Sequence, residues 1–497
     1  MSIALVIIFG FLLLSLYLGI RATRGKKMNL EQWSVGGRGF GTMFVFLLLA
    51  GEVYTTFTFL GASGWVYRSG TAALYVLAYI TLAYILSYWL LPPIWKFSQK
   101  HQIVSQSDFF VKKFNSPYLG ILVSIVGIIA VVPYFILQLK GLGIIVSETS
   151  YGSISPTAAI WIGAIAVTIY VMISGIHGSA WTAVIKDITI LIVVVFLGLY
   201  IPYHYYGGIQ PMFEAVHQTK PEFLTFPKEG LSISWFISTV LLSVLGFYMW
   251  PHALAPVFAA KNVKVFRKNA VILPVYTLML LFIVFVGYTA LLKVPDLKGA
   301  EGDLALLRIS IMSFEPWVVG FIGAAGLLTA LVPSSIMLMS ASTLFSKNIY
   351  KFFVPSATEG QMMNVAKWAV PVITLISVYF ALDKGNSLST LLLMGYSLVT
   401  QLFPPLLFSL SKRNFVNKYG AFLGIICGIA TVAYVTISKT SFSTLFPTLP
   451  SVVKDINIGF IALLVNTIIM VGVSMMTRTL EDGHRPLVQK EETKTII

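Results

Sequence analysis

The sequence predicts an all-α polytopic membrane protein that crosses the bilayer about thirteen times. First, 57% of its 497 residues are hydrophobic and only 11% are charged, whereas soluble domains are roughly 45–50% apolar. Second, the apolar residues form runs of about 20, the length that spans a bilayer as a helix. Third, glycine and proline interrupt two of these runs, which is typical of transporters built from two inverted repeats.

The predicted spans cover nearly the whole chain. They are residues 3–20, 42–65, 71–95, 119–145, 156–174, 182–203, 232–254, 271–292, 315–345, 365–382, 387–410, 419–437 and 457–476. The two interrupted runs, 42–65 and 232–254, are five spans apart and therefore cross in opposite directions. We expect a first five-helix repeat over 42–203, an external loop over 204–231 and a second five-helix repeat over 232–410. An extra helix at 1–21, two peripheral helices at 411–476 and a cytoplasmic tail at 477–497 complete the division.

Charge predicts the orientation of the chain. Most of the 34 Lys and Arg residues fall in alternate loops, beginning with Arg21 and Arg24 after the first span, and such loops face the cytoplasm. The N-terminus is then extracellular, the C-terminus is cytoplasmic, and the plasma membrane is the expected location. No basic residue precedes the first apolar run, so we interpret it as a retained helix, not a cleaved signal. The net charge of +15 is explained by contact with anionic lipid, which excludes a nucleic-acid partner.

Several classes of function lack any sequence support. The only cysteine is Cys427, which excludes an internal disulfide and a cysteine metal cluster. No phosphate-binding loop, nucleophile elbow or zinc-protease motif occurs, so we expect no enzyme activity and no cofactor. The loops are too short to form a soluble domain, and no obligatory protein partner is indicated. The expected partners are a small-molecule solute, a coupling cation and the lipid bilayer.

The first interrupted run carries a carboxylate at the depth of the membrane. Charged groups there are costly and usually line an ion or substrate path, and a break leaves backbone carbonyls free to bind a cation. We therefore assign Gly51, Glu52 and Tyr54 to ion coupling. Glu52 could carry a proton, balance a bound Na⁺, pair with Lys140 or form a structural ion pair between helices. Lys140 could instead reach the interface or attract a substrate carboxylate.

The candidate solute-binding residues are polar or aromatic groups in or near the interrupted runs. We expect a water-lined cavity where the two runs unwind, closed by aromatic side chains, with His252 as a pH-sensitive group or a satisfied helix-end residue. Core packing is the simpler interpretation of each aromatic side chain, and backbone capping that of the threonines. The residues are Thr55, Thr56, Gln138, Phe247, Tyr248, Trp250 and Gln401.

Several motifs together resemble the sodium:solute symporter family over about residues 30–430, and most closely its bacterial monocarboxylate permease branch. The likeness extends to proline and pantothenate permeases. It rests on 31–38 (EQWSVGGR), 59–61 (FLG), 186–187 (KD), 249–252 (MWPH), 267–269 (RKN), 273–276 (LPVY), 331–337 (LVPSSIM) and 348–351 (NIYK). The resemblance implies the leucine-transporter-type 5+5 inverted-repeat fold. It also implies ion-coupled uptake of a small monocarboxylate or amino acid by alternating access.

The resemblance also implies roles for individual residues, and this sequence departs from the family's pattern at one pair of positions. It places Asp187 on the cytoplasmic ion-exit route, although a salt bridge with Lys186 is the structural alternative. In typical sodium-coupled members two adjacent hydroxyl residues hold the ion, and these positions are Val332 and Pro333 here. Thr329 or Ser335 would have to substitute, and coupling to H⁺ through Glu52 competes with coupling to Na⁺. A membrane sensor on the same scaffold and a passive channel are the remaining alternatives.

Overall fold

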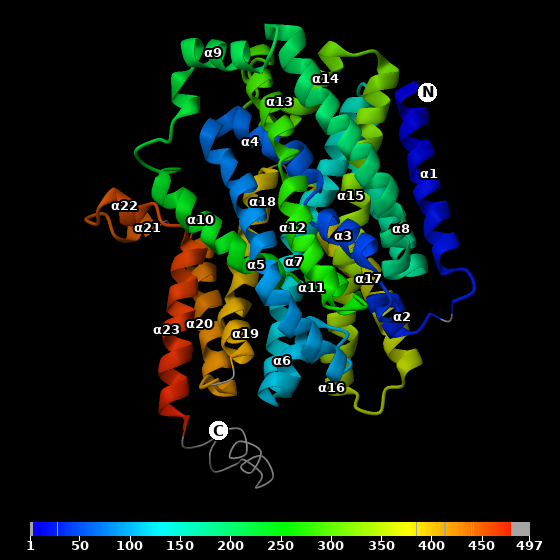
Figure 1. Ribbon diagram of the computed structural model, residues 1–497, viewed down its shortest axis with the longest axis vertical. Coiled ribbons are helices and arrows are strands. Elements are labelled where there is room, and N and C mark those ends of the chain that lie inside the picture. The colour runs from blue at the N-terminus through cyan, green and yellow to red at the C-terminus, as the bar shows by residue number, and fades with distance from the viewer. Residues whose placement is uncertain are drawn as a thin grey trace.

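The computed structural model describes residues 3–26, 28–383, 385–411, 414–438, 440 and 442–478. Within these ranges the chain is helical, and its only β-type pairing is an isolated bridge between Phe40 and Ala260. Ten of the described helices are long and apolar enough to span a membrane, or eleven if one bent pair is counted as a span. The helices stand side by side along the long axis of the molecule (Figure 1).

The first half of the chain contains nine α-helices and two short helical pieces that matter for the site. The helices are α1 (Ile3–Thr23), α2 (Leu30–Val35), α3 (Thr42–Gly51), α4 (Ala62–Ser69), α5 (Tyr75–Lys100), α6 (Gln106–Phe114), α7 (Pro117–Thr149), α8 (Pro156–Tyr206) and α9 (Ile209–Thr219). The short pieces are the π-helix η2 (Phe57–Gly61) and the 3-10 helix η3 (Gly70–Leu74).

The second half repeats this alternation of long and short helices. The helices are α10 (Ile233–Gly246), α11 (Pro251–Ala259), α12 (Lys264–Thr277), α13 (Leu280–Lys293), α14 (Ala305–Ser313), α15 (Pro316–Leu344), α16 (Lys351–Phe353), α17 (Glu359–Ala381), α18 (Leu388–Val399), α19 (Phe403–Leu410), α20 (Lys418–Ile437), α21 (Phe442–Leu445), α22 (Ser451–Lys454) and α23 (Ile458–Met476). Short pieces used below are η5 (Phe247–Met249), η6 (Gly299–Leu304), η7 (Phe345–Tyr350) and η8 (Thr400–Leu402).

Helix α8 contains two of the predicted spans, 156–174 and 182–203, and the chain reverses between them. Gly175 has φ 52° and ψ −150°, which interrupts the helix. The hydroxyls of Tyr170 and Thr182 are 2.7 Å apart, whereas 12 residues of straight helix rise about 18 Å. A Cβ at position 175 would lie 2.6 Å from the carbonyl oxygen of Trp33, so this turn requires glycine.

Both interrupted runs are broken, and they point in opposite directions. The first run continues from α3 through η2 into α4, and the second from α10 through η5 into α11 with a bend of 50°. In Figure 1, α4 lies in the upper part of the molecule and α11 in the lower part. This opposite arrangement is the inverted repeat that the sequence predicts.

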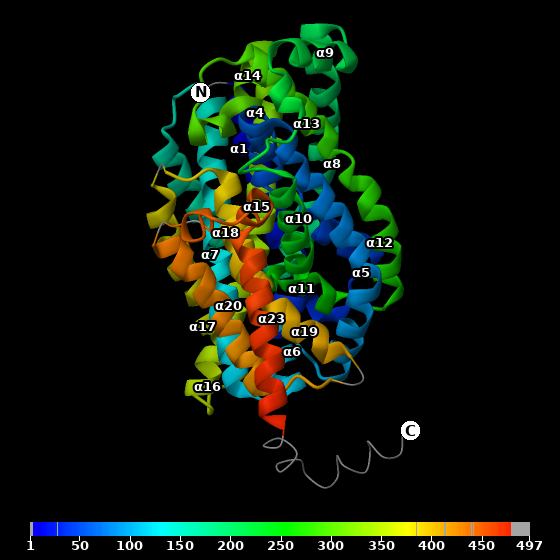
Figure 2. The ribbon, with the colours of Figure 1, turned by 90° about the vertical axis from the view of Figure 1, so that its left-hand side faces the viewer.

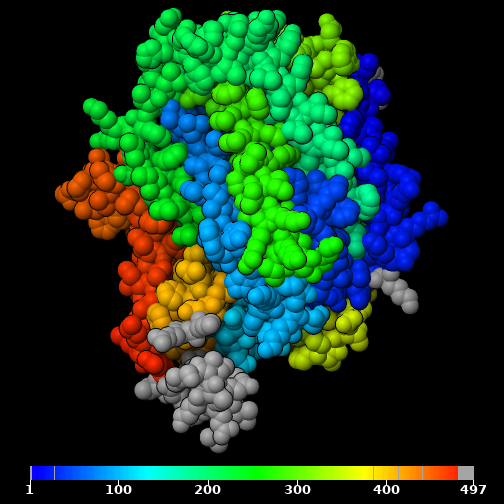
Figure 3. Space-filling view, viewed as in Figure 1, coloured from blue at the N-terminus to red at the C-terminus, as the bar shows by residue number. Residues whose placement is uncertain are grey.

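The remaining helices surround this pair. Helix α1 packs against α8 and α15 at one edge of the molecule (Figure 1), and α20 and α23 pack together at another (Figure 2). Helices α5 and α12 lie against each other on the face drawn in Figure 3. The predicted external loop 204–231 contains α9 and a short 3-10 turn at Pro221–Leu224. The predicted tail lies outside the described residues from position 479 onward.

Candidate solute and ion site

The break after α3 keeps its backbone carbonyls paired by side chains from neighbouring helices. The carbonyl of Leu49 accepts from the Tyr84 hydroxyl (2.8 Å), and that of Glu52 accepts from the Tyr134 hydroxyl (3.2 Å). The Thr58 hydroxyl donates to the carbonyl of Val53 at 2.6 Å. Irregular backbone is tolerated at membrane depth only where such partners exist, so these hydroxyls hold the break open.

Glu52 lies at this break and faces the second broken helix. Its Oε2 is 3.0 Å from Nε2 of His252, at the start of α11, and its side chain is only 3% exposed. Of the alternatives for Glu52, pairing with Lys140 is therefore wrong, because the partner of Glu52 is His252. The ring of His252 in turn packs between those of Tyr134 and Trp250, at 5.5 and 5.3 Å.

Helix α7 contributes a polar face to the same place. Tyr134 and Gln138 are four residues apart and share one side of the helix. Oε1 of Gln138 accepts hydrogen bonds from the backbone N–H and the hydroxyl of Thr56, at 3.3 and 2.7 Å. The close approach is possible because residue 141 is glycine: a Cβ there would lie 2.5 Å from Cβ of Thr56.

The break after α10 has a different cause. Trp250 is extended (φ −66°, ψ 129°) and Pro251 begins α11, because proline cannot continue the preceding helix but suits the first helical turn. The carbonyl of Met249 accepts from the amide of Gln106 at 2.6 Å. The Trp250 ring then lies 5.0 Å from Tyr134 and 5.3 Å from Tyr396.

The central site, formed by Glu52, Thr56, Tyr134, Gln138, Trp250 and His252, is closed to water. All six residues are at most 6% exposed, so the water-lined cavity predicted where the two runs unwind does not appear among these six residues. Five polar atoms of the site have no hydrogen-bond partner among the described residues: Glu52 Oε1, Gln138 Nε2, Trp250 Nε1 and both ring nitrogens of His252, although His252 Nε2 lies 3.0 Å from Glu52 Oε2. Buried polar atoms are normally paired, so this group demands an explanation.

The other predicted solute-binding residues take different places. Thr55 accepts a hydrogen bond from the N–H of Phe57 (3.2 Å), which is the backbone-capping role. Phe247 packs on Tyr84 and Tyr248, with ring centroids 5.4 and 5.0 Å apart. Gln401 contacts a different part of the molecule. Its Oε1 accepts a hydrogen bond from the side-chain amide of Asn466 in α23 at 3.1 Å.

A second set of polar side chains, from α8 and α15, lies beside the break after α3. Lys186 is fully buried, and its Nζ lies 2.9 Å from Asp187 Oδ1 and 3.4 Å from the carbonyl of Tyr54. The salt-bridge alternative for Asp187 is thus present. The Ser335 hydroxyl bonds the carbonyl of Val332 and the Ser179 hydroxyl, both at 2.6 Å. Thr329 bonds back to the carbonyl of Gly326 at 2.6 Å.

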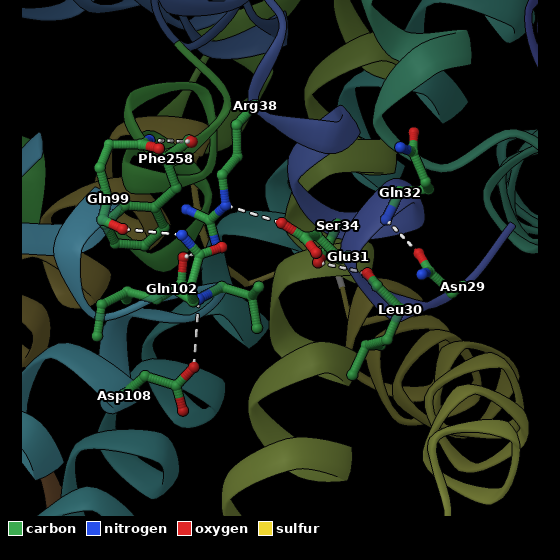
Figure 4. Close-up of polar contacts among 12 residues, drawn as sticks. Asn29, Leu30, Glu31, Gln32, Ser34, Arg38, Gln99, Gln102, Asp108 and Phe258 are labelled. Atoms are coloured by element: carbon green, nitrogen blue, oxygen red, sulfur yellow. Dashed lines mark hydrogen bonds and ion pairs between the residues drawn. The ribbon is translucent and has the colours of Figure 1, made fainter. Parts of the chain in front are cut away.

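Polar contacts also close the end of the molecule that carries α2, α6 and α16, which we predict to be cytoplasmic. Arg38 pairs with Glu31 at 2.8 Å and donates to the carbonyl of Ile103 at 2.9 Å (Figure 4). Asp108 of α6 pairs with Lys347 of η7 at 2.9 Å. The pair between Asp108 and Lys347 joins the two predicted repeats at this end.

An ion pair closes the opposite end. Arg68 of α4 lies 3.0 Å from Asp303 of η6 and 3.3 Å from the Ser389 hydroxyl of α18. The backbone N–H of Leu388 donates to the second oxygen of Asp303 at 2.9 Å. Burial raises the pKa of the Asp303 carboxyl, and the Arg68 guanidinium opposes that rise. The central site is therefore enclosed between two polar closures, as in an occluded transporter.

Breaking the second closure should destabilise the protein. We expect Arg68→Met to lower the thermal denaturation midpoint strongly, because leaving one partner of a buried pair alone costs about 3–5 kcal/mol. Adding Asp303→Asn should recover part of the loss, since it removes the unpaired charge. The matched control is Arg308→Met, whose pair with Glu148 is more exposed and should contribute at most about 1 kcal/mol. Equal midpoints for the two single variants would contradict the prediction.

Two oppositely directed broken helices, enclosed in a bundle with polar groups at both breaks, define a membrane transporter for a small solute. The chain belongs to the sodium:solute symporter family, whose model matches residues 33–428. It is therefore a multi-pass membrane protein of a symporter family.

Named relatives agree with this assignment. The chain is 65% identical to "Uncharacterized symporter YhjB" of Bacillus subtilis, over 96% of this chain and 98% of the relative. It is 30% identical to "Monocarboxylate transport permease protein" of Rhizobium johnstonii, over 83% and 84%. Among solved structures, a Na⁺-coupled sialic acid symporter in an outward-open state matches with a TM-score of 0.76 at 19% identity, over 97% and 98%. The leucine-transporter-type fold is thus confirmed.

Three groups that meet the breaks were not predicted from the sequence to lie there. The hydroxyls of Tyr84 and Tyr134 bond carbonyls of the first break, and Lys186 reaches the carbonyl of Tyr54. The tyrosines carry no sequence signal, because aromatic residues make up 14% of the chain. Lys186 did carry one, since a lysine next to an aspartate within an apolar run is rare.

Proposed function

We propose that this protein is a secondary active symporter that takes up a small monocarboxylate, such as lactate, pyruvate or acetate, by alternating access at the central site. The observation that carries the proposal is the group of unpaired buried donors, Gln138 Nε2 and Trp250 Nε1, beside both helix breaks. A carboxylate can accept hydrogen bonds from both. The printed name of the Rhizobium johnstonii relative supports the choice of solute class.

A small zwitterionic amino acid, such as alanine or proline, is a second candidate solute. The specific observation is Glu52 Oε1, a buried acceptor without a partner among the described residues. A substrate ammonium group would supply that partner while its carboxylate meets Gln138 and Trp250. Pantothenate, a larger carboxylate, completes the set of solutes to be tested. In this proposal the protein lies in the plasma membrane with its N-terminus outside, and it needs no cofactor and no protein partner.

Uptake into proteoliposomes tests the proposal. The purified full chain is reconstituted and offered labelled lactate, pyruvate, acetate, alanine, proline and pantothenate, first under an inward Na⁺ gradient and then under an inward H⁺ gradient. We expect one solute class to accumulate under one gradient and to leak out when an ionophore is added. Where net charge enters with the solute, as with a zwitterionic amino acid and one cation, each charge moving across 100 mV contributes about 2.3 kcal/mol, enough for roughly fiftyfold accumulation. Equilibration without accumulation under either gradient would indicate a passive channel instead.

A further inference from the structure

The ammonium group of Lys186 lies where the break of α3 exposes its backbone. Nζ is 3.4 Å from the carbonyl oxygen of Tyr54, and a Cβ built on Gly51 would lie 3.5 Å from it. The side chain enters from α8 and is completely buried. A Cβ at position 51 would thus be in van der Waals contact with the ammonium group, which places Lys186 directly against the backbone of the break.

Helix α15 faces this point and presents methyl groups to it, together with few oxygen atoms that are not already hydrogen-bonded. Val332 of α15 lies 3.9 Å from the Cβ position of Gly51 and packs with Leu47 and Ala183 in a small apolar cluster. The Ser335 hydroxyl is already bonded to the carbonyl of Val332 and to Ser179. Hard cations require several oxygen ligands in one shell, and this set does not provide them around the Tyr54 carbonyl.

The charge at this point is already balanced. Lys186 pairs with Asp187 at 2.9 Å, and the Asp187 side chain is 5% exposed. A metal cation on the Tyr54 carbonyl would lie close to the ammonium group, and two like charges at that distance repel strongly where water is excluded. It would also leave an uncompensated positive charge in a buried place, which is costly.

We propose that Lys186 Nζ is the resident cation of the α3 break, so that the protein binds no Na⁺ there and its symport does not use Na⁺. The lysine supplies, as a permanently tethered group, the single positive charge that a bound Na⁺ would otherwise bring to the Tyr54 carbonyl and the Asp187 carboxylate. The transport part of this inference rests on the proposed symport function, whereas the binding part does not.

Thermal denaturation of the purified full chain in detergent tests the binding part without any solute. Choline chloride is replaced by NaCl, and separately by KCl, at constant ionic strength. We expect no Na⁺-specific change in the midpoint of the wild type. Lys186→Ala combined with Val332→Ser should gain a Na⁺-specific rise in the midpoint, because it frees the Tyr54 carbonyl and Asp187 and adds a hydroxyl oxygen. If that double variant does not fold, Lys186→Gln combined with Val332→Ser takes its place in the same measurement.

The matched control is Lys140→Ala, the same change at another lysine within a span, which should remain insensitive to Na⁺. A Na⁺-specific stabilisation of the wild type would overturn the proposal, and so would a double variant that folds but does not respond to Na⁺. In proteoliposomes, uptake by the wild type should be unchanged when choline replaces Na⁺. If no solute accumulates at all, the proposed function fails while the thermal result still decides this inference.

Discussion

Replacing Glu52 with glutamine should abolish coupled uptake. Glutamine keeps the size of the side chain but removes the buried negative charge that lies 3.0 Å from His252 Nε2. Breaking a buried pair of this kind costs about 3–5 kcal/mol, which corresponds to roughly two to nearly four orders of magnitude in an equilibrium constant. The measurement is the initial rate of gradient-driven uptake of the solute identified in proteoliposomes.

The control for Glu52 makes the same change at a carboxylate of similar chemistry but greater exposure. Glu148→Gln alters a pair with Arg308 in which the two side chains are 23% and 47% exposed, and such pairs contribute little. We expect normal uptake from Glu148→Gln. Thermal denaturation of both variants separates a loss of transport from a loss of folding. Accumulation at a near-normal level by a folded Glu52→Gln variant would remove Glu52 from the coupling mechanism.

Gly141→Val should abolish uptake and destabilise the protein by at least about 3 kcal/mol, since overpacking a filled interior typically costs 1–3 kcal/mol and here involves a branched side chain. A Cβ at this position lies 2.5 Å from Cβ of Thr56. The clash is with a short side chain fixed by its bond to Gln138, so it cannot swing aside. Helix α7 must then move away from the first break and carry Gln138 with it.

Gly10→Val is the matched control for Gly141→Val. Gly10 lies within α1, and no atom comes within 4 Å of a Cβ built there. The same valine should therefore leave the denaturation midpoint and the uptake rate almost unchanged. If both variants lose stability equally, the loss reflects valine in a helix and not contact with Thr56.

The sequence predicts the broken helices because their causes are local. Pro251 ends the helix before it whatever its neighbours are, and Gly51 is a weak helix former at the end of α3. The partner of Glu52 could not be predicted in this way. His252 lies 200 positions further along the chain, and only the packing of the two repeats brings the two side chains together.

Gln401 shows a second limit of prediction from sequence, which concerns the neighbour that a buried polar residue contacts. A polar residue in an apolar run indicates that one face of the helix is not exposed to lipid, but it does not indicate which neighbour that face meets. Here the neighbour is α23, through Asn466 and the carbonyl of Gly459. The division of the chain into repeats, loop and tail stays a prediction, as do the roles assigned to the ion-coupling residues.

The isolated bridge between Phe40 and Ala260 has a mechanical consequence. The N–H of Phe40 donates to the carbonyl of Ala259, and the N–H of Lys261 donates to the carbonyl of Phe40, both at 3.0 Å. Phe40 lies two residues before the start of α3, and Ala259 is the last residue of α11. These two hydrogen bonds thus join the two discontinuous helices at one end. A tilt of either helix must move the other helix with it unless both hydrogen bonds first break.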